Sequence, residues 1–397
     1  MTKRSTMRFL EFFERPRALE MMLVATLASG TLASIVISRS LGPTGRGLIT
    51  TLMVWSQLIG WIAAFSFDRA VVVLTQPDRE NRMEVTSAFV AARLHIMLLS
   101  IPTAGFSIVL GEFLFHEWTW AALLTIGTVA TSFSQVAAGW LLAKRKMAWY
   151  VLFRMFQPAL YLIAVLGVAL LFRAHASTFR LDALGVTSIS SLIIPAVFVN
   201  MFAPLRLKER IDSRRLRAFA ATAQLANSMQ YLNSRLDIIC LTVFSTPHQV
   251  GIYVVGLAAG QAAVVMGSAS FVRGMAGTAK SLDRHGLAAT FLIGVVIAIL
   301  SPRIIPLVFG SSFEASVRVA QIIGIGAPIN YALQSADGRL LGMGKPSFAA
   351  TAELAGAVAF GVGIAFSLNL EVVAFADVGS YAVALILCQI FLRRSSA

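Results

Sequence analysis

Apolar runs follow one another along almost the whole chain, each long enough to form a helix of about 20 residues. Such a helix spans the roughly 30 Å hydrocarbon core of a bilayer. Of the 397 residues, 57% are hydrophobic and 13% are charged, whereas soluble domains average about 45–50% apolar and about 25% charged residues. The runs also lack the alternating segments of about 10 residues that are typical of membrane β-barrels. The sequence therefore predicts an all-α polytopic membrane protein.

Twelve of these runs are long enough to cross a membrane, and the connections between them leave no room for a soluble domain. The run at 48–75 is over-long, so we expect it to be bent, tilted or partly interfacial. The N-terminus is basic and then apolar, like a signal peptide, but its apolar part is of spanning length, which predicts an uncleaved first helix. The expected spans are 18–38, 48–75, 86–110, 119–143, 149–172, 181–203, 217–243, 249–272, 286–309, 314–337, 347–368 and 371–392.

The basic residues are distributed unevenly between the apolar runs. The net charge is +14, and most of the 33 Lys and Arg residues fall in alternate connections, such as those containing AKRK and LRLKERIDSRR. Because cytoplasmic loops are enriched in Lys and Arg, this pattern predicts that both termini are cytoplasmic. Topology and contact with anionic lipid head groups explain the positive charge, so we expect no nucleic-acid partner. Cys240 and Cys388 lie inside apolar runs, which predicts buried thiols and neither a disulfide nor a metal or cofactor site.

Two short patterns recur in the second half of the chain. GWLLAKRKMAW at 139–149 corresponds to GRLLGMGKPSF at 338–348, and LGPTGRGLI corresponds to STPHQVGIY. A repeat of six spans in the same orientation implies two lobes with a central cavity and alternating access. We therefore predict an N-terminal six-helix lobe at 1–203 and a C-terminal six-helix lobe at 217–397. The basic segment 204–216 is predicted to be a cytoplasmic linker on the anionic lipid surface.

Three motifs in order resemble one family of transporters. They are ASIVISRSLGPTGRGLI at 33–49, NSRLDIICLTVFSTPHQVGIYVVGLA at 233–258 and PRIIPLVFGSSFEASVRVAQIIGIG at 302–326. The chain resembles the polysaccharide (O-antigen type) flippases of the multidrug/oligosaccharidyl-lipid/polysaccharide exporter superfamily. The resemblance implies a two-lobed transporter that flips an undecaprenyl-pyrophosphate-linked oligosaccharide across the bacterial inner membrane. It further implies a polysaccharide polymerase and glycosyltransferases as partners.

Polar residues gather in the predicted span 217–243, and Arg235 and Asp237 are the charged ones. At 100° per residue they fall on different sides of the helix, so they are not a simple pair. We expect Arg235 to face the central cavity and Asp237 to orient it or to contact the other lobe, or the reverse. The alternative is a pair of buried structural ion pairs with other helices. Gln224 and Tyr231 share the face of Arg235, with Asn227 at its edge, and Asn233 shares the side of Asp237.

Four more arginines fall within predicted spans: Arg69, Arg93, Arg154 and Arg318. Arg binds phosphate groups bidentately and stays charged at any physiological pH. Inward arginines from both lobes would therefore form a cationic chamber for the pyrophosphate that the resemblance implies. The alternative for the last three is snorkelling to a nearby membrane face. Arg69 could instead form a local ion pair with Asp68.

Titratable groups in or near the spans could couple transport to a proton or a sodium ion. The alternative for each is a helix-end or packing role. The residues are Glu20, His95, Asp337, Glu353 and Asp377.

Other function classes find less support. The chain has no phosphate-binding loop of the Walker type, so ATP is not its direct energy source. It also has no cluster with metal-ligand spacing, and its scattered carboxylates do not suit a glycosyltransferase or polymerase, so we expect no enzyme. One alternative is a cation-coupled drug or small-molecule antiporter of the same superfamily, which usually carries an acidic residue midway along its first span. The other is a non-transporting membrane scaffold for envelope synthesis.

Overall fold

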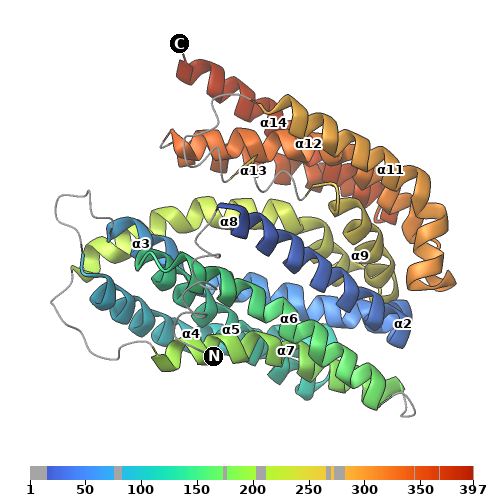
Figure 1. Ribbon diagram of the computed structural model, residues 1–397, viewed down its shortest axis with the longest axis horizontal. Helices are drawn as coiled ribbons and strands as arrows, with labels where there is room; N and C mark the ends of the chain where they lie inside the picture. The colour runs from blue at the N-terminus through green and yellow to red at the C-terminus, as the bar shows by residue number, and fades with distance from the viewer. Residues whose placement is uncertain are drawn as a thin grey trace. The chain divides into compact units, whose positions relative to one another are not determined.

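A computed structural model describes residues 16–75, 83–172, 177–202, 212–264, 270–271, 282–343, 345–365 and 367–396 (Figure 1). Within these ranges the chain forms α-helices and one 3-10 helix, with no strand. By contacts it divides into two compact units. Unit 1 takes the described residues within 1–36 and 52–225, and unit 2 takes those within 37–51 and 226–397. The prediction of an all-α membrane protein is confirmed.

The first predicted span and the first part of the second form one long helix, α2 (Pro16–Ala63), with a kink at Gly42. Gly42 has φ of 65°, which a residue without Cβ adopts at little cost, and Pro43 has no N–H to continue the helical bonding. A second break follows at Phe65 and Ser66, both with positive φ, and α3 (Phe67–Leu74) leaves at 45°. The over-long predicted span is therefore bent.

Unit 1 is built around α5 (Trp118–Ala143), which packs against α3, α4 (Val85–Phe115) and α7 (Ser177–Phe202). The helix α6 (Met147–Leu171) packs against α5 and α7 (Figure 1). Alanines and aromatic side chains together fill the core, and the ring centroids of Phe89 and Trp140 lie 5.2 Å apart. Glu84 caps α4 by accepting a hydrogen bond from the Ser87 N–H. Partial burial raises the pKa of the Glu84 carboxyl, but hydrogen bonds from Thr86 and Ser87 outweigh burial and hold this pKa below its usual value.

Unit 2 is built around α12 (Ser316–Gly342), which packs against α9 (Pro247–Gln261), α11 (Arg284–Phe309) and α14 (Leu370–Ser396) (Figure 1). The helix α13 (Pro346–Ile364) packs mainly on α14, and the 3-10 helix η1 (Ser311–Phe313) joins α11 to α12. Arg39, from the part of α2 that belongs to unit 2, donates to the carbonyl oxygens of Leu307 and Val308. These carbonyls lie at the C-terminal end of α11, where a cation is favourable.

The two recurring turns predicted from the sequence pack against each other within unit 2. A Cβ atom on Gly47 would lie 1.8 Å from the Pro247 carbonyl oxygen, and one on Gly251 would lie 1.9 Å from the Pro43 carbonyl oxygen. Each glycine therefore packs directly against the carbonyl group of the proline in the opposite turn. Only residues without a side chain allow this approach.

Seven helices in the described part of the chain are each long and apolar enough to cross a membrane, and the bent α2–α3 pair adds an eighth candidate. The helix α8 (Ser213–Phe244) is of spanning length but much less apolar. Its residues up to Leu225 belong to unit 1 and the rest to unit 2. The linker predicted at 204–216 lies outside the described residues as far as position 211. The lobes at 1–203 and 217–397 stay a prediction.

Candidate functional site

The helix α8 carries five of the nine residues predicted from the sequence to bind substrate. Its first predicted residue, Gln224, is buried in unit 1, and its side-chain oxygen Oε1 accepts a hydrogen bond of 2.8 Å from the Ser66 hydroxyl. Ser66 is one of the two residues at the break between α2 and α3. Gln224 therefore ties α8 to the bend in the second predicted span.

The remaining predicted residues of α8 belong to unit 2. Asp237 is 1% exposed, and its Oδ2 accepts a hydrogen bond of 2.8 Å from the Tyr253 hydroxyl of α9. Asn233 lies one turn earlier on the same side and donates to the carboxylate of Glu353 on α13. Arg235 is half-buried, in electrostatic range of both Asp237 and Tyr231. Asn227 is also buried.

Buried carboxyl groups extend from α8 through the interior of unit 2. Asp377 of α14 lies within electrostatic range of Asp237, and the Tyr381 hydroxyl, one turn further along α14, approaches it. Neither carboxyl oxygen of Asp377 makes a hydrogen bond of standard geometry within the described residues. Asp377 and Tyr381 line a small crevice together with Asn330. This crevice has the polar groups that a proton or a small cation requires.

A second pair of buried carboxyls in unit 2 lies on other helices. Asp337 of α12 and Glu353 of α13 are within hydrogen-bonding reach of each other. The Cys388 thiol of α14 donates to Asp337 Oδ1 at 3.2 Å. Two carboxylates this close repel each other unless a proton or another cation is shared between them. We call Asp237, Asp337, Glu353 and Asp377 the acidic network.

Two predicted arginines of unit 1 lie within electrostatic range of one acid. Asp68 of α3 is in electrostatic range of its neighbour Arg69 and of Arg154 on α6. Arg154 donates to Gln135 Oε1 at 3.2 Å and lies over the Tyr150 ring. These contacts form a polar cluster within the helix bundle.

The other two predicted arginines lie elsewhere. Arg93 lines a groove between α4, α5 and α7 of unit 1. Arg318 is exposed in the first turn of α12, so it lies at an end of its helix and not midway along it. The structure thus brings together Tyr231, Arg235 and Asp237 in unit 2, and Arg69 with Arg154 in unit 1. A single cationic chamber stays a prediction.

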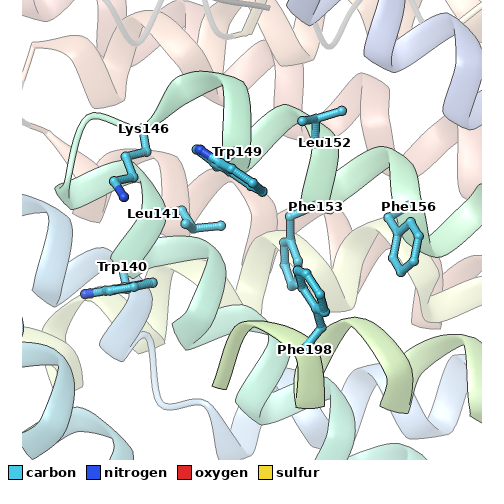
Figure 2. A pocket seen from close by; sticks show the side chains of 8 residues that line it. All are labelled: Trp140, Leu141, Lys146, Trp149, Leu152, Phe153, Phe156 and Phe198. Atoms are coloured by element: carbon cyan, nitrogen blue, oxygen red, sulfur yellow. The ribbon is translucent and has the colours of Figure 1, made fainter. Parts of the chain in front are cut away.

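A larger cavity of unit 1 contains none of the predicted residues. It measures about 490 Å³ and lies where α5 ends and α6 begins, with α7 on its other side. Figure 2 shows Trp149, Phe153, Phe156 and Phe198 among its lining residues, with Lys146 as the charged one, and the ring centroids of Phe156 and Phe198 lie 6.5 Å apart. The lining is otherwise aromatic and aliphatic. Such a cavity suits a hydrocarbon chain better than a sugar or a pyrophosphate.

Of the other titratable groups, His95 has a local role, because its Nδ1 bonds the Ala91 carbonyl at 2.7 Å and its ring packs on Phe67. The side chain of Glu20 lies outside the described residues. No group of three or more metal-ligating side chains is found among the residues that the structure describes. Sequence reasoning missed Tyr253 and Tyr381 as partners of buried acids. The spacing of Asp377 and Tyr381, four residues apart on one helix, was the available signal.

No family model matches the chain, and no curated protein matches it. Solved structures do. An inward-facing multidrug resistance MATE family transporter of the MOP superfamily is 12% identical over 93% of this chain and 94% of that chain, with a TM-score of 0.68. The lipid II flippase MurJ in an inward closed conformation is 13% identical over 94% of this chain and 87% of its own, with a TM-score of 0.69.

A third similar structure is a MOP superfamily transporter from Pyrococcus furiosus, described by the reversed polarity of its binding pocket. It is 12% identical over 95% of this chain and 94% of that chain, with a TM-score of 0.66. Sequence identities this low indicate a shared fold but do not indicate which cargo is transported. The coverage and TM-scores show that this chain has the two-lobed, twelve-helix fold of the MOP superfamily transporters.

Proposed function

We propose that this protein flips an undecaprenyl-pyrophosphate-linked oligosaccharide across the bacterial inner membrane by alternating access, for polysaccharide export. The fold supports a transporter, because it is shared with the lipid II flippase MurJ and with MATE transporters. The observation that carries the choice of cargo is Arg235, a half-buried guanidinium within α8, nine residues before the helix ends at Phe244. A permanent cation at membrane depth marks a ligand or a pathway, and a pyrophosphate is the anion that a guanidinium binds best.

The remainder of the proposed site lies around Arg235. Tyr231 is one helical turn away and offers a hydroxyl for a sugar or a phosphate, and Asn227 is one further turn along α8. Arg69 and Arg154 of unit 1, with Gln224, would supply a second set of donors. The protein would load cargo at the cytoplasmic face, and a polysaccharide polymerase and glycosyltransferases would act on the same lipid-linked sugar.

The acidic network supports coupling to a proton or a sodium ion. Asp377 has carboxyl oxygens without a standard hydrogen bond within the described residues, and it lines a crevice next to Tyr381 and Asn330. A cation held there would change the charge beside Arg235, because Asp377 and Arg235 lie within electrostatic range. Cation binding would thereby alter the attraction of Arg235 for an anionic cargo.

The first test replaces the protein by its Arg235→Ala variant in cells that depend on it and measures whether the lipid-linked sugar accumulates. We expect normal membrane insertion, build-up of the undecaprenyl-linked intermediate in the inner leaflet, and export lowered about 10-fold or more, since hydrogen bonds to a charged group contribute about 1.5–3 kcal/mol. The matched control is Arg303→Ala, an exposed arginine of α11, which should export normally. Unchanged export by Arg235→Ala would remove the basis of the proposal and favour a scaffold.

A cation-coupled drug antiporter is the second candidate, and the acidic network is the observation in its favour. Four buried carboxyls in one unit suit a cationic cargo as well as a coupling ion. In that case Arg235→Ala would leave efflux of a cationic dye intact or increase it, while Asp377→Asn would abolish efflux. A flippase requires instead that Arg235→Ala lose export of the anionic lipid-linked sugar, so the effect of Arg235→Ala distinguishes the two candidates.

A further inference from the structure

Arg93 lies in a groove of unit 1 that the proposed transport cycle does not use. The groove is formed by α4, α5 and α7 and has a volume of about 430 Å³. Arg93 is the one charged side chain among the described residues that line it, and most of the others are apolar. The groove therefore has a single cationic point in an apolar wall.

The wall of this groove is open to the surroundings of the protein. Met97, Ile126 and Val197 line it and are 48%, 47% and 49% exposed. They belong to α4, α5 and α7, each long and apolar enough to span a membrane. Apolar side chains exposed on spanning helices face hydrocarbon. The groove is thus accessible to a lipid from within the bilayer.

The guanidinium of Arg93 lacks a protein partner within the described residues. Its Nε and Nη1 atoms are both buried and make no hydrogen bond. Arg154 of the same unit provides the contrast, because it donates to Gln135 and lies over Tyr150. Buried donors without acceptors are unfavourable, and an anion that draws the guanidinium out would relieve this.

The depth of Arg93 suits a lipid phosphate. The helix α4 begins at Val85, so the Arg93 backbone lies about 12 Å further along at 1.5 Å per residue. Head-group layers are about 5–7 Å thick on each side of the hydrocarbon core, and an arginine side chain reaches back toward them. Asn200, the polar residue near the end of α7, lines the groove as well. In the predicted topology this end of both helices is cytoplasmic.

We propose that this groove binds one anionic glycerophospholipid of the surrounding leaflet. Arg93 holds the phosphate through its guanidinium, and an acyl chain lies along Met97, Ile126 and Val197. An anionic lipid fits better than a zwitterionic one, because the described residues that line the groove include no carboxylate to pair with an amine. This assigns Arg93 to a bound lipid and not to the chamber for cargo, and it does not depend on the proposed function.

The test is lipid binding by the purified full-length protein, measured by native mass spectrometry after titration with phosphatidylglycerol or phosphatidylethanolamine. We expect wild type to prefer phosphatidylglycerol, and Arg93→Gln to weaken phosphatidylglycerol binding by about 10-fold, the effect of losing a charged hydrogen-bond partner. Arg303→Gln, at an exposed arginine of α11, is the control and should bind as wild type does. Val197→Trp fills the groove from an exposed position with the charge intact, and should lose binding as well.

The proposal would be wrong if either variant, Arg93→Gln or Val197→Trp, bound phosphatidylglycerol as tightly as the wild-type protein does. It would also be wrong if the wild-type protein bound phosphatidylglycerol and phosphatidylethanolamine with equal affinity. Should Arg93→Gln fail to fold, Val197→Trp decides the outcome alone. Undecaprenyl phosphate serves as a competitor. If undecaprenyl phosphate displaces bound phosphatidylglycerol at lower concentrations than added phosphatidylglycerol does, the groove binds the cargo lipid and the phospholipid assignment is wrong.

Discussion

The hydrogen bond between Asp237 and Tyr253 stabilises the buried acid of α8 inside unit 2. Both side chains are buried, and the tyrosine hydroxyl donates to Oδ2 of the carboxyl at 2.8 Å. The other oxygen, Oδ1, is buried without a hydrogen bond in the described part of the chain. The carboxyl therefore depends strongly on one donor, and that donor comes from a helix that begins only after α8 has ended.

Removing this donor should destabilise the protein. Tyr253→Phe leaves the ring in place but leaves the buried carboxyl without the hydroxyl, which costs about 1–3 kcal/mol of unfolding free energy. The measurement is denaturant unfolding of the purified protein in detergent. The double variant Tyr253→Phe, Asp237→Leu should lose less than the sum of the two single variants, because it removes both partners together.

Tyr331→Phe is the matched control for this prediction. Tyr331 is equally buried, but its hydroxyl makes only a 3.5 Å contact with the Asp283 carbonyl. We expect it to lose clearly less stability than Tyr253→Phe. Equal losses in the two variants would mean that the Asp237 hydrogen bond contributes nothing beyond the general effect of removing a buried hydroxyl.

Elements were predictable where a local pattern determines them. The predicted span 119–143 became α5 (Trp118–Ala143) and 286–309 became α11 (Arg284–Phe309), because apolar length alone sets such helices. The angular pattern of α8 predicted different sides for Arg235 and Asp237, and in the structure Asp237 is buried while Arg235 is half-buried. The break at Phe65 and Ser66 has no Gly or Pro to reveal it, and the contact of Asn233 with Glu353 joins residues 120 apart in sequence. Tertiary packing alone determines both.

The paired turns of α2 and α9 form the element-scale contact that substitution should disrupt most. Gly47→Ala and Gly251→Ala each place a methyl group within 2 Å of a backbone oxygen of the other turn, and backbone cannot rotate away as a side chain does. We expect each variant to lose about 1–3 kcal/mol of stability or more, the cost of overpacking, and to export poorly.

The control for the paired turns is Gly361→Ala in α13, where a Cβ would meet no atom within 4 Å. Replacing a helical glycine by alanine in open space should leave stability unchanged or raise it by about 0.5–1 kcal/mol. Thermal unfolding of the three variants side by side gives the comparison. If Gly47→Ala and Gly251→Ala unfold at the same temperature as Gly361→Ala, the close approach of the two turns is not required.

At the scale of the whole molecule, the fold is shared with transporters that are only 12–13% identical over more than nine-tenths of this chain. This is physically reasonable, because a polytopic helical fold needs apolar length and small residues at close contacts more than particular side chains. The buried charges are the part that such a fold leaves free to vary. We therefore expect Arg235, Arg93 and the acidic network to determine the cargo, the bound lipid and the coupling ion.

The orientation of the whole molecule in the membrane follows from charge and can be tested directly. Basic residues concentrate in alternate connections, which predicts that the C-terminus is cytoplasmic and that the connection through η1 (Ser311–Phe313) lies outside. An alkaline phosphatase fused after Ser312 should be active, and one fused at the C-terminus inactive, while a fluorescent protein at the C-terminus should fluoresce. The reverse pattern would put both termini outside and make loading of cargo from the cytoplasm at the predicted face impossible. Equal activity at both fusion sites would mean that an odd number of the helices α12, α13 and α14 fails to cross.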